Sequence, residues 1–112
     1  MEARALTKYV RMSPRKVRRV AELVRGKATE EAITILHFTR KNASEYLEKT
    51  IRSAVANVMY VNPGADTHKL FVKEVFIDGG PTLKRGRAGS MGRRAMIRRR
   101  TSHITVVVAE KS

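Results

Sequence analysis

The sequence predicts an α+β fold, and two patterns carry that prediction. Residues 2–12, 69–78 and 103–109 have the alternation or the β-branched composition of strands. Between the first and second of these segments, three stretches repeat apolar residues at helical spacing. The chain has 112 residues, of which 42% are hydrophobic, so it can build one modest core and does not read as disordered. We therefore expect residues 1–112 to form a single domain.

The first strand is predicted over residues 2–12. Its alternation places Leu6 and Val10 on one face and Ala5 and Tyr9 on the other, because successive side chains of a strand point to opposite sides.

A helix is predicted directly after this strand. Ser13 suits the N-cap, and Pro14 suits the first helical position, where its missing N–H costs no hydrogen bond. Gly26 suits the left-handed residue that follows a helix end. One side of this helix is apolar and the opposite side is rich in arginine, so only the first can face a core. The apolar stripe consists of Val17, Val20, Ala21 and Val24.

Two further helices follow. Thr29 is predicted to cap the second, which has two glutamates in its first turn to complement the helix dipole. Asn42 and Glu45 resemble a capping box at the start of the third, and residues 62–64 (NPG) end it. The expected buried positions are Ala32, Ile33, Ile35, Leu36 and Phe38 in the second helix and Leu47, Ile51, Ala54, Val55 and Val58 in the third.

The second and third strands are predicted over residues 69–78 and 103–109. Alternation in the second strand puts Phe71, Val75 and Ile77 on one face and Leu70, Val72 and Phe76 on the other.

The segment between these strands, about residues 79–102, is glycine-rich and has few large apolar residues. Two interpretations stay open: a flexible basic loop, or a long two-stranded ribbon in which both flanking strands continue out of the domain. A structureless loop of this length is uncommon in a compact domain, and an isolated ribbon is only marginally stable in water. A ribbon would therefore need a partner, and the composition of the segment predicts an anionic one.

The net charge of +14 is divided unevenly along the chain. Residues 1–27 carry +7, residues 28–83 carry −1, residues 84–100 carry +8 and residues 101–112 carry zero. Two basic blocks thus flank a nearly neutral centre, which predicts two surfaces that bind a polyanion. Nucleic acid is the first candidate and an anionic membrane surface the second. A membrane-spanning helix is excluded, since no run approaches 18 apolar residues.

The candidate binding residues are the arginines of these blocks. On the first predicted helix, the arginines have only Glu22 as an acidic neighbour at helical spacing. Arginine predominates, as expected for bidentate phosphate contacts in folded RNA, and residues 77–112 have no aromatic side chain for a base-stacking platform. The candidates are Arg15, Arg18, Arg19 and Arg25 in the first block and Lys84, Arg85, Arg87, Arg93, Arg94, Arg98, Arg99 and Arg100 in the second.

Signals for catalysis or metal binding are weak. His37, His68 and His103 lack metal-ligand spacing, and the acidic residues form no pair suited to acid–base chemistry. There is no cysteine and no phosphate-loop motif. We expect no enzyme activity, no metal and no cofactor.

Five strings, in order, are similar to one known family. They are RMSPRKVRR at residues 11–19, VRGK at 24–27, SAVAN at 53–57, GPTLKR at 80–85 and RTSHITV at 100–106. Together they resemble the large-subunit ribosomal protein number twenty-two (L-twenty-two) family in its bacterial form. The resemblance implies three helices packed on a three-stranded antiparallel sheet, in the order β-α-α-α-β-β, with a long protruding β-hairpin.

The same resemblance implies a structural, non-enzymatic role. Its members bind large-subunit (23S-type) ribosomal RNA and support early assembly, with the globular part near the opening of the peptide exit tunnel and the hairpin on the tunnel wall. The implied partners are that RNA, neighbouring ribosomal proteins and the nascent peptide, with no membrane and no homo-oligomer, in the cytoplasm rather than an organelle. The RNA-binding residues that the resemblance implies are Arg11, Arg15, Lys16, Arg18 and Arg19, then Lys84, Arg85, Arg93, Arg98, Arg99 and Arg100. The basic blocks add four further predicted contacts, Arg25, Lys27, Arg87 and Arg94.

The hairpin tip departs from the family pattern. Residues 88–94 read AGSMGRR, where the family has Pro-Arg-Ala-x-Gly-Arg-Ala, so a proline and one arginine are missing. The alternative to an RNA-binding role is a DNA-binding architectural protein, which would share the charge and prefer duplex DNA.

Overall fold

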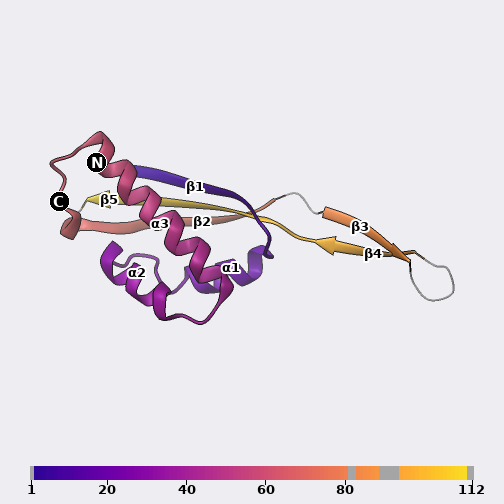
Figure 1. Cartoon of the computed structure of the whole chain (residues 1–112). Helices are drawn as coiled ribbons and strands as arrows, with labels where there is room; N and C mark the ends of the chain where they lie inside the picture. Colours follow the sequence, from indigo (N-terminus) through magenta and orange to yellow (C-terminus); the bar gives the residue numbers. More distant parts are fainter. Residues whose placement is uncertain (1, 81–82, 89–93, 111–112) are drawn as a thin grey trace.

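The computed structural model describes residues 2–80, 83–88 and 94–110, and the side chains of residues 2–80 and 100–110 (Figure 1). A helical layer covers one face of a sheet, and a two-stranded ribbon leaves one end of that sheet. The elements are β1 (Glu2–Val10), α1 (Pro14–Ala21), α2 (Thr29–Phe38), α3 (Asn42–Val61), a short 3-10 helix (Thr67–Lys69), β2 (Leu70–Gly79), β3 (Leu83–Ala88), β4 (Arg94–Arg99) and β5 (Ser102–Glu110).

The main sheet has three antiparallel strands in the order β1-β5-β2. The last strand in the chain is therefore the central one, which suits its β-branched composition. Its residues Ile104, Val106 and Val108 are fully buried against the helices. The predicted α+β class is confirmed, as are the three helices and the antiparallel sheet.

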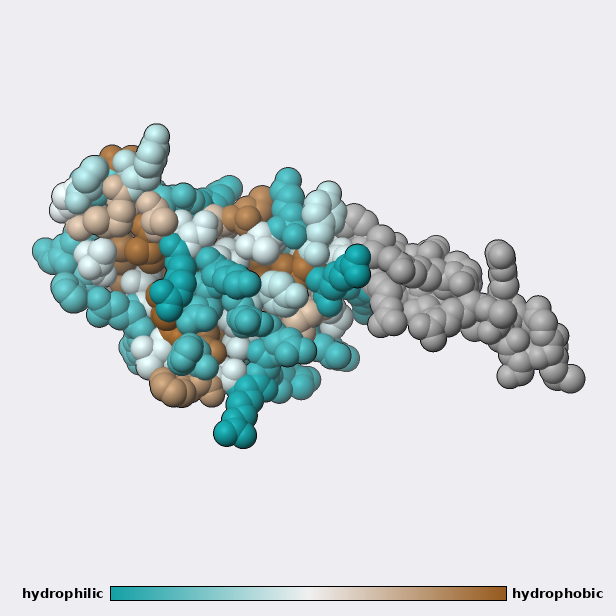
Figure 2. All heavy atoms as spheres, viewed as in Figure 1, coloured by the Kyte–Doolittle hydropathy of each residue, from teal (hydrophilic) through white to brown (hydrophobic). Residues whose placement is uncertain are grey.

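The core lies between this sheet and the helices, and α3 supplies its longest apolar stripe. Leu47, Ile51, Ala54 and Val58 are fully buried on that helix, as the helical spacing predicted. The outer face of the helical layer is polar with scattered apolar residues (Figure 2). No helix in the described ranges is both long enough and apolar enough to cross a membrane.

A bulge in β1 changes which side chains face the core. Pairing with β5 shifts register between Thr7 and Val10, and Tyr9 within this bulge adopts a positive φ of 59°. The extra residue reverses the alternation. Val10 is consequently buried while Leu6 is 50% exposed, so the prediction that they share a face is wrong.

A second bulge has the same effect in β2. The pairing with β5 shifts between Val72 and Glu74. Leu70 and Val72 before the bulge therefore face the core together with the two buried residues after it, Val75 and Ile77. The predicted division of these four residues between two faces is wrong.

The helix ends match the prediction only in part. Ser13 occupies the N-cap of α1 and Pro14 its first position, as predicted, although the Ser13 side chain makes no capping hydrogen bond. The helix ends at Ala21, and Gly26 (φ 81°) lies beyond a further turn. Thr29 and Asn42 are the first residues of their helices rather than caps, with Ala28 and Lys41 in the cap positions. The predicted capping box is therefore absent. The end of α3 before Asn62 matches the prediction.

The ribbon consists of β3 and β4, paired antiparallel from Leu83 opposite Arg99 to Ala88 opposite Arg94. It projects from the end of β2 and β5 and gives the molecule its length, with extents of 64 × 26 × 15 Å (Figure 1). Of the two interpretations of residues 79–102, the ribbon is the correct one. The predicted contact Arg93 and most of the atypical tip lie outside the described residues.

Candidate nucleic-acid interface

The outer face of α1 presents the first group of cations. The inner face of the helix buries Val17, Val20 and Ala21, so the intervening residues turn to solvent. We refer to the exposed set as the α1 cation row. In the part of the chain that the structure describes, these side chains have no hydrogen bond or ion pair, so their donors are directed to solvent. The row consists of Arg11, Arg15, Lys16 and Arg19.

Two other predicted RNA contacts are bound to the protein itself. The Arg18 Nε and Nη2 groups donate to the Ile77 carbonyl oxygen at 3.2 and 2.8 Å. The Arg25 Nη2 group donates to the Val75 carbonyl oxygen at 2.9 Å, and Arg25 also pairs with Glu22. These arginines tie the helical layer to β2. A guanidinium carries five N–H donors, so each keeps donors for a second partner.

The segment that follows α1 also forms hydrogen bonds along the outer edge of β2. The Gly26 N–H donates to the Val72 carbonyl at 2.9 Å, and the Val72 N–H donates to the Lys27 carbonyl at 2.8 Å. Because β2 is an edge strand, its outward backbone groups would otherwise be open to pairing with another chain. The Lys27 side chain is exposed, and it is the backbone carbonyl of Lys27 that takes part in this pairing.

The second group of predicted contacts lies on the ribbon. The backbone register places Lys84 opposite Arg98 and Arg87 opposite Ala95. Positive charges directly opposite each other weaken a strand pair, so this ribbon gains from a bound counter-charge. Arg100, which follows β4, is exposed at the base of the ribbon.

The two basic regions meet where the ribbon leaves the sheet. The Ser102 hydroxyl donates to the Met12 carbonyl at 2.6 Å, and the Gly80 N–H donates to the Thr101 carbonyl at 2.9 Å. A Cβ placed on Gly79 would lie 3.9 Å from Pro14 Cγ, so the start of α1 packs at this junction. The α1 cation row and the base of the ribbon therefore lie next to each other, although they are far apart in the sequence, and we refer to the two together as the basic strip.

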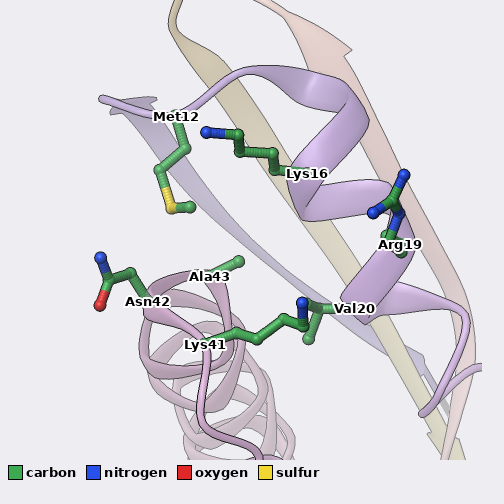
Figure 3. Close-up of a pocket in the computed structure, with 7 residues that line it drawn as sticks. All are labelled: Met12, Lys16, Arg19, Val20, Lys41, Asn42 and Ala43. Carbon is green, nitrogen blue, oxygen red and sulfur yellow. The ribbon is translucent and has the colours of Figure 1, made fainter.

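A hollow of about 300 Å³ lies beside this strip, between α1 and the start of α3 (Figure 3). Lys41 joins Lys16 and Arg19 of α1 in its lining, from the chain before α3, and its side chain runs toward Val20 (Figure 3). Sequence reasoning missed Lys41 because it lies in the nearly neutral central segment. The only local signal was the basic pair Arg40-Lys41 just before a helix start.

The described ranges contain no cluster of three or more His, Asp or Glu residues that could hold a metal ion. On the exposed surface, the hydrogen bond and charge of Lys73 lower the pKa of Glu2, and Glu2 raises the pKa of Lys73.

Comparison with known proteins gives a match over nearly the whole chain. The family model described as Ribosomal protein L22p/L17e matches residues 5–109. Two proteins named large ribosomal subunit protein uL22, from two strains of Desulfitobacterium hafniense, are 54% identical over 110 residues, covering 98% of this chain and 96% of theirs. A protein of the same name from Halothermothrix orenii is 52% identical over 111 residues, covering 99% of this chain and 97% of its own. The chain belongs to the ribosomal protein L22p/L17e family.

Proposed function

We propose that this protein is a structural constituent of the large ribosomal subunit that binds large-subunit ribosomal RNA through the basic strip. The observation that carries the proposal is the position of the α1 cation row next to the base of the ribbon, at the Met12–Ser102 contact. Family membership over residues 5–109 supports the same role. We assign the protein no catalytic function.

The proposed contacts differ in kind between the two ends of the strip. At the α1 end, Arg15, Lys16 and Arg19 project from a helix that the core holds in place, and Arg11 lies just before that helix, so these exposed side chains bind RNA at fixed positions. On the ribbon, RNA phosphates also supply the counter-charge that a doubly basic strand pair lacks. The ribbon contacts are Lys84, Arg85, Arg87, Arg93, Arg94 and Arg98 to Arg100.

We extend the proposal to the position of the protein in the subunit. By resemblance to the family, the body lies near the opening of the peptide exit tunnel and the ribbon lines its wall, next to the nascent peptide. The protein joins the subunit early in assembly and contacts neighbouring ribosomal proteins, in the cytoplasm. The length of the molecule, 64 Å along its longest axis, is compatible with a surface body and an inward-reaching ribbon.

The test is the salt dependence of binding to purified large-subunit RNA. Each phosphate neutralised releases counterions, so the logarithm of the binding constant falls with the logarithm of salt concentration, with a slope of about −0.7 to −0.9 for each contact. We expect a slope equivalent to several contacts, and co-sedimentation with large subunits after a high-salt wash. A binding constant that does not change with salt would contradict the proposal.

A competition assay separates RNA from DNA as the partner. Structured large-subunit RNA and duplex DNA are added as competitors at equal phosphate concentration. We expect the RNA to displace labelled RNA at much lower concentration. Equal or better displacement by duplex DNA would instead favour an architectural DNA-binding role.

A further inference from the structure

The hollow between α1 and the start of α3 has an apolar floor and a cationic rim. Val20 and Ala43 form the floor and are each 1% exposed, and Met12 closes one side (Figure 3). Lys16 and Arg19 come to the rim from α1, and Lys41 comes from the chain that precedes α3. Asn42 adds an amide, and none of the lining residues is acidic.

The arrangement of charge indicates an anionic occupant. Lys16, Arg19 and Lys41 are all exposed, and among the described residues none of the three has a carboxylate partner. Three cations around one small hollow repel one another unless an anion lies between them. The two lysines contribute mobile ammonium groups, and the guanidinium contributes a planar pair of donors suited to phosphate oxygens.

The dimensions and position of the hollow favour a nucleotide unit over a lone carboxylate. Its volume of about 300 Å³ exceeds the need of a carboxylate and leaves room for a sugar ring. Lys16 and Arg19 belong both to the hollow and to the α1 cation row. An RNA strand can therefore place one nucleotide in the hollow and continue along the row without leaving the basic surface.

We propose that this hollow binds one phosphate–ribose unit of the RNA backbone, with Lys41 as a phosphate contact and Asn42 as a hydrogen-bonding partner for the sugar or phosphate. The inference rests on the proposed RNA-binding function and adds to it a defined pocket and two residues outside the basic blocks. It also gives α3 a direct part in RNA binding, through the residues that open the helix.

The test compares Lys41→Met with Lys49→Met in the full-length chain. Both residues are exposed lysines, but Lys49 lies further along α3 and does not line the hollow. The probe is purified large-subunit RNA, titrated at several salt concentrations. We expect Lys41→Met to weaken binding several-fold at low salt and to reduce the salt slope by about one contact, with Lys49→Met close to wild type. Thermal unfolding of both variants should match the wild type, because neither side chain is buried.

A double-mutant cycle then tests whether the cations share one phosphate. If they do, Lys16→Met and Lys41→Met together will cost less than the product of their separate fold-changes, because the first removal already weakens the hold on that phosphate. Strictly multiplicative losses would contradict a shared site.

The absence of cysteine allows a direct positional readout. A single Glu45→Cys variant, exposed in the first turn of α3, can carry a hydroxyl-radical reagent. We expect cleavage of the RNA at one short segment, lost when Lys41→Met is added and retained when Lys49→Met is added. Equal effects of Lys41→Met and Lys49→Met, with wild-type RNA binding intact, would overturn the pocket alone. Failure of the wild-type protein to bind the RNA would overturn the proposed function itself.

Discussion

The chain runs from one strand of the body out into the ribbon and back into another strand of the body, but the body and the ribbon depend on different sources of stability. In the body, β2 and β5 pair with each other and bury one face against the helices, with Val72 and Val106 fully inaccessible to solvent. Beyond Gly79 and Ser102 the path continues as β3 and β4, which pair only with each other among the described strands. The body is therefore stabilised by burial of apolar surface. The described strands of the ribbon are held by the hydrogen bonds between β3 and β4 and by their attachment to β2 and β5.

The difference separates the parts that fold the protein from the parts that we propose bind RNA. A two-stranded ribbon is marginal by itself, so its shape is set by what surrounds it and by how its base is held. The first basic region contains residues of both kinds. Arg18 and Arg25 stabilise the fold, whereas the α1 cation row is directed to solvent. The predictions below test this division, and each concerns the stability of the body.

The largest effect is expected from a cavity in the core under α3. Leu47 is fully buried, so Leu47→Ala should lower the free energy of unfolding by about 3 kcal/mol, measured by urea denaturation. Tyr60→Ala on the same helix is the control, since Tyr60 is 88% exposed and its loss should cost no more than about 0.5 kcal/mol. Similar losses for the two variants would contradict the assignment of the core.

The next effect is expected at the junction of the two regions. A Cβ on Gly80 would lie 2.4 Å from Thr101 Oγ1 and 3.2 Å from two ring atoms of His103, so Gly80→Ala must displace them. We expect a loss of about 1–3 kcal/mol in a thermal or urea unfolding experiment. Gly79→Ala meets only Pro14 Cγ at 3.9 Å and should be nearly neutral. Equal stability of the two variants would show that the base of the ribbon is loosely packed.

A smaller effect is expected from the arginine that fastens α1 to β2. Arg18→Ala removes two hydrogen bonds to the Ile77 carbonyl and should cost about 1–2 kcal/mol of unfolding free energy. Arg15→Ala removes a similar charge from the same helix, where it has no partner among the described residues, and should leave stability unchanged. If Arg15→Ala were as destabilising as Arg18→Ala, the distinction between fold arginines and RNA-binding arginines would fail.

A small pH-dependent effect is expected from the exposed Glu2–Lys73 pair. Because the folded pKa of Glu2 is lowered from 4.5, its contribution is present at neutral pH and is lost as pH falls through the folded value. Because the folded pKa of Lys73 is raised from 10.5, its contribution is lost as pH rises through the folded value. Glu2→Gln should therefore slightly reduce the change of melting temperature with pH at both the acidic and the alkaline end of the range. A larger change in the variant at either end would contradict this pairing.

The smallest effect on the body is expected from the largest change in the chain. Deleting residues 86–94 removes most of the ribbon and none of the core, so the melting temperature of the body should stay within a few degrees of wild type. The same deletion should weaken binding to large-subunit RNA strongly. Loss of the cooperative unfolding transition on deletion would show that the ribbon is part of the folding unit.

Local sequence patterns predicted the elements well but assigned several residues to the wrong face or role. Periodicity located the three α-helices and each strand of the main sheet, because burial repeats with the local geometry of the chain, but it did not predict the short 3-10 helix at Thr67–Lys69. A single bulge residue reverses that alternation without any clear signal in the sequence, which is why the faces of β1 and β2 were wrong. The capping box failed because Ser44, within α3, bonds back to the carbonyls of Thr39 and Lys41, while Asn42 is already helical.

The sequence by itself determined that the protein has a neutral, foldable centre and two basic regions, which predict a polyanionic partner. Charge and apolar spacing are properties of composition and order, so they can be read without coordinates. Only the tertiary structure decided which cations bond to the protein itself and which are directed to solvent. It set Arg18 and Arg25 against β2, placed the α1 cation row next to the base of the ribbon and brought Lys41 into the lining of the same hollow as Lys16. These pairings depend on how distant segments pack around the core, and packing is a property of the whole fold rather than of any local stretch.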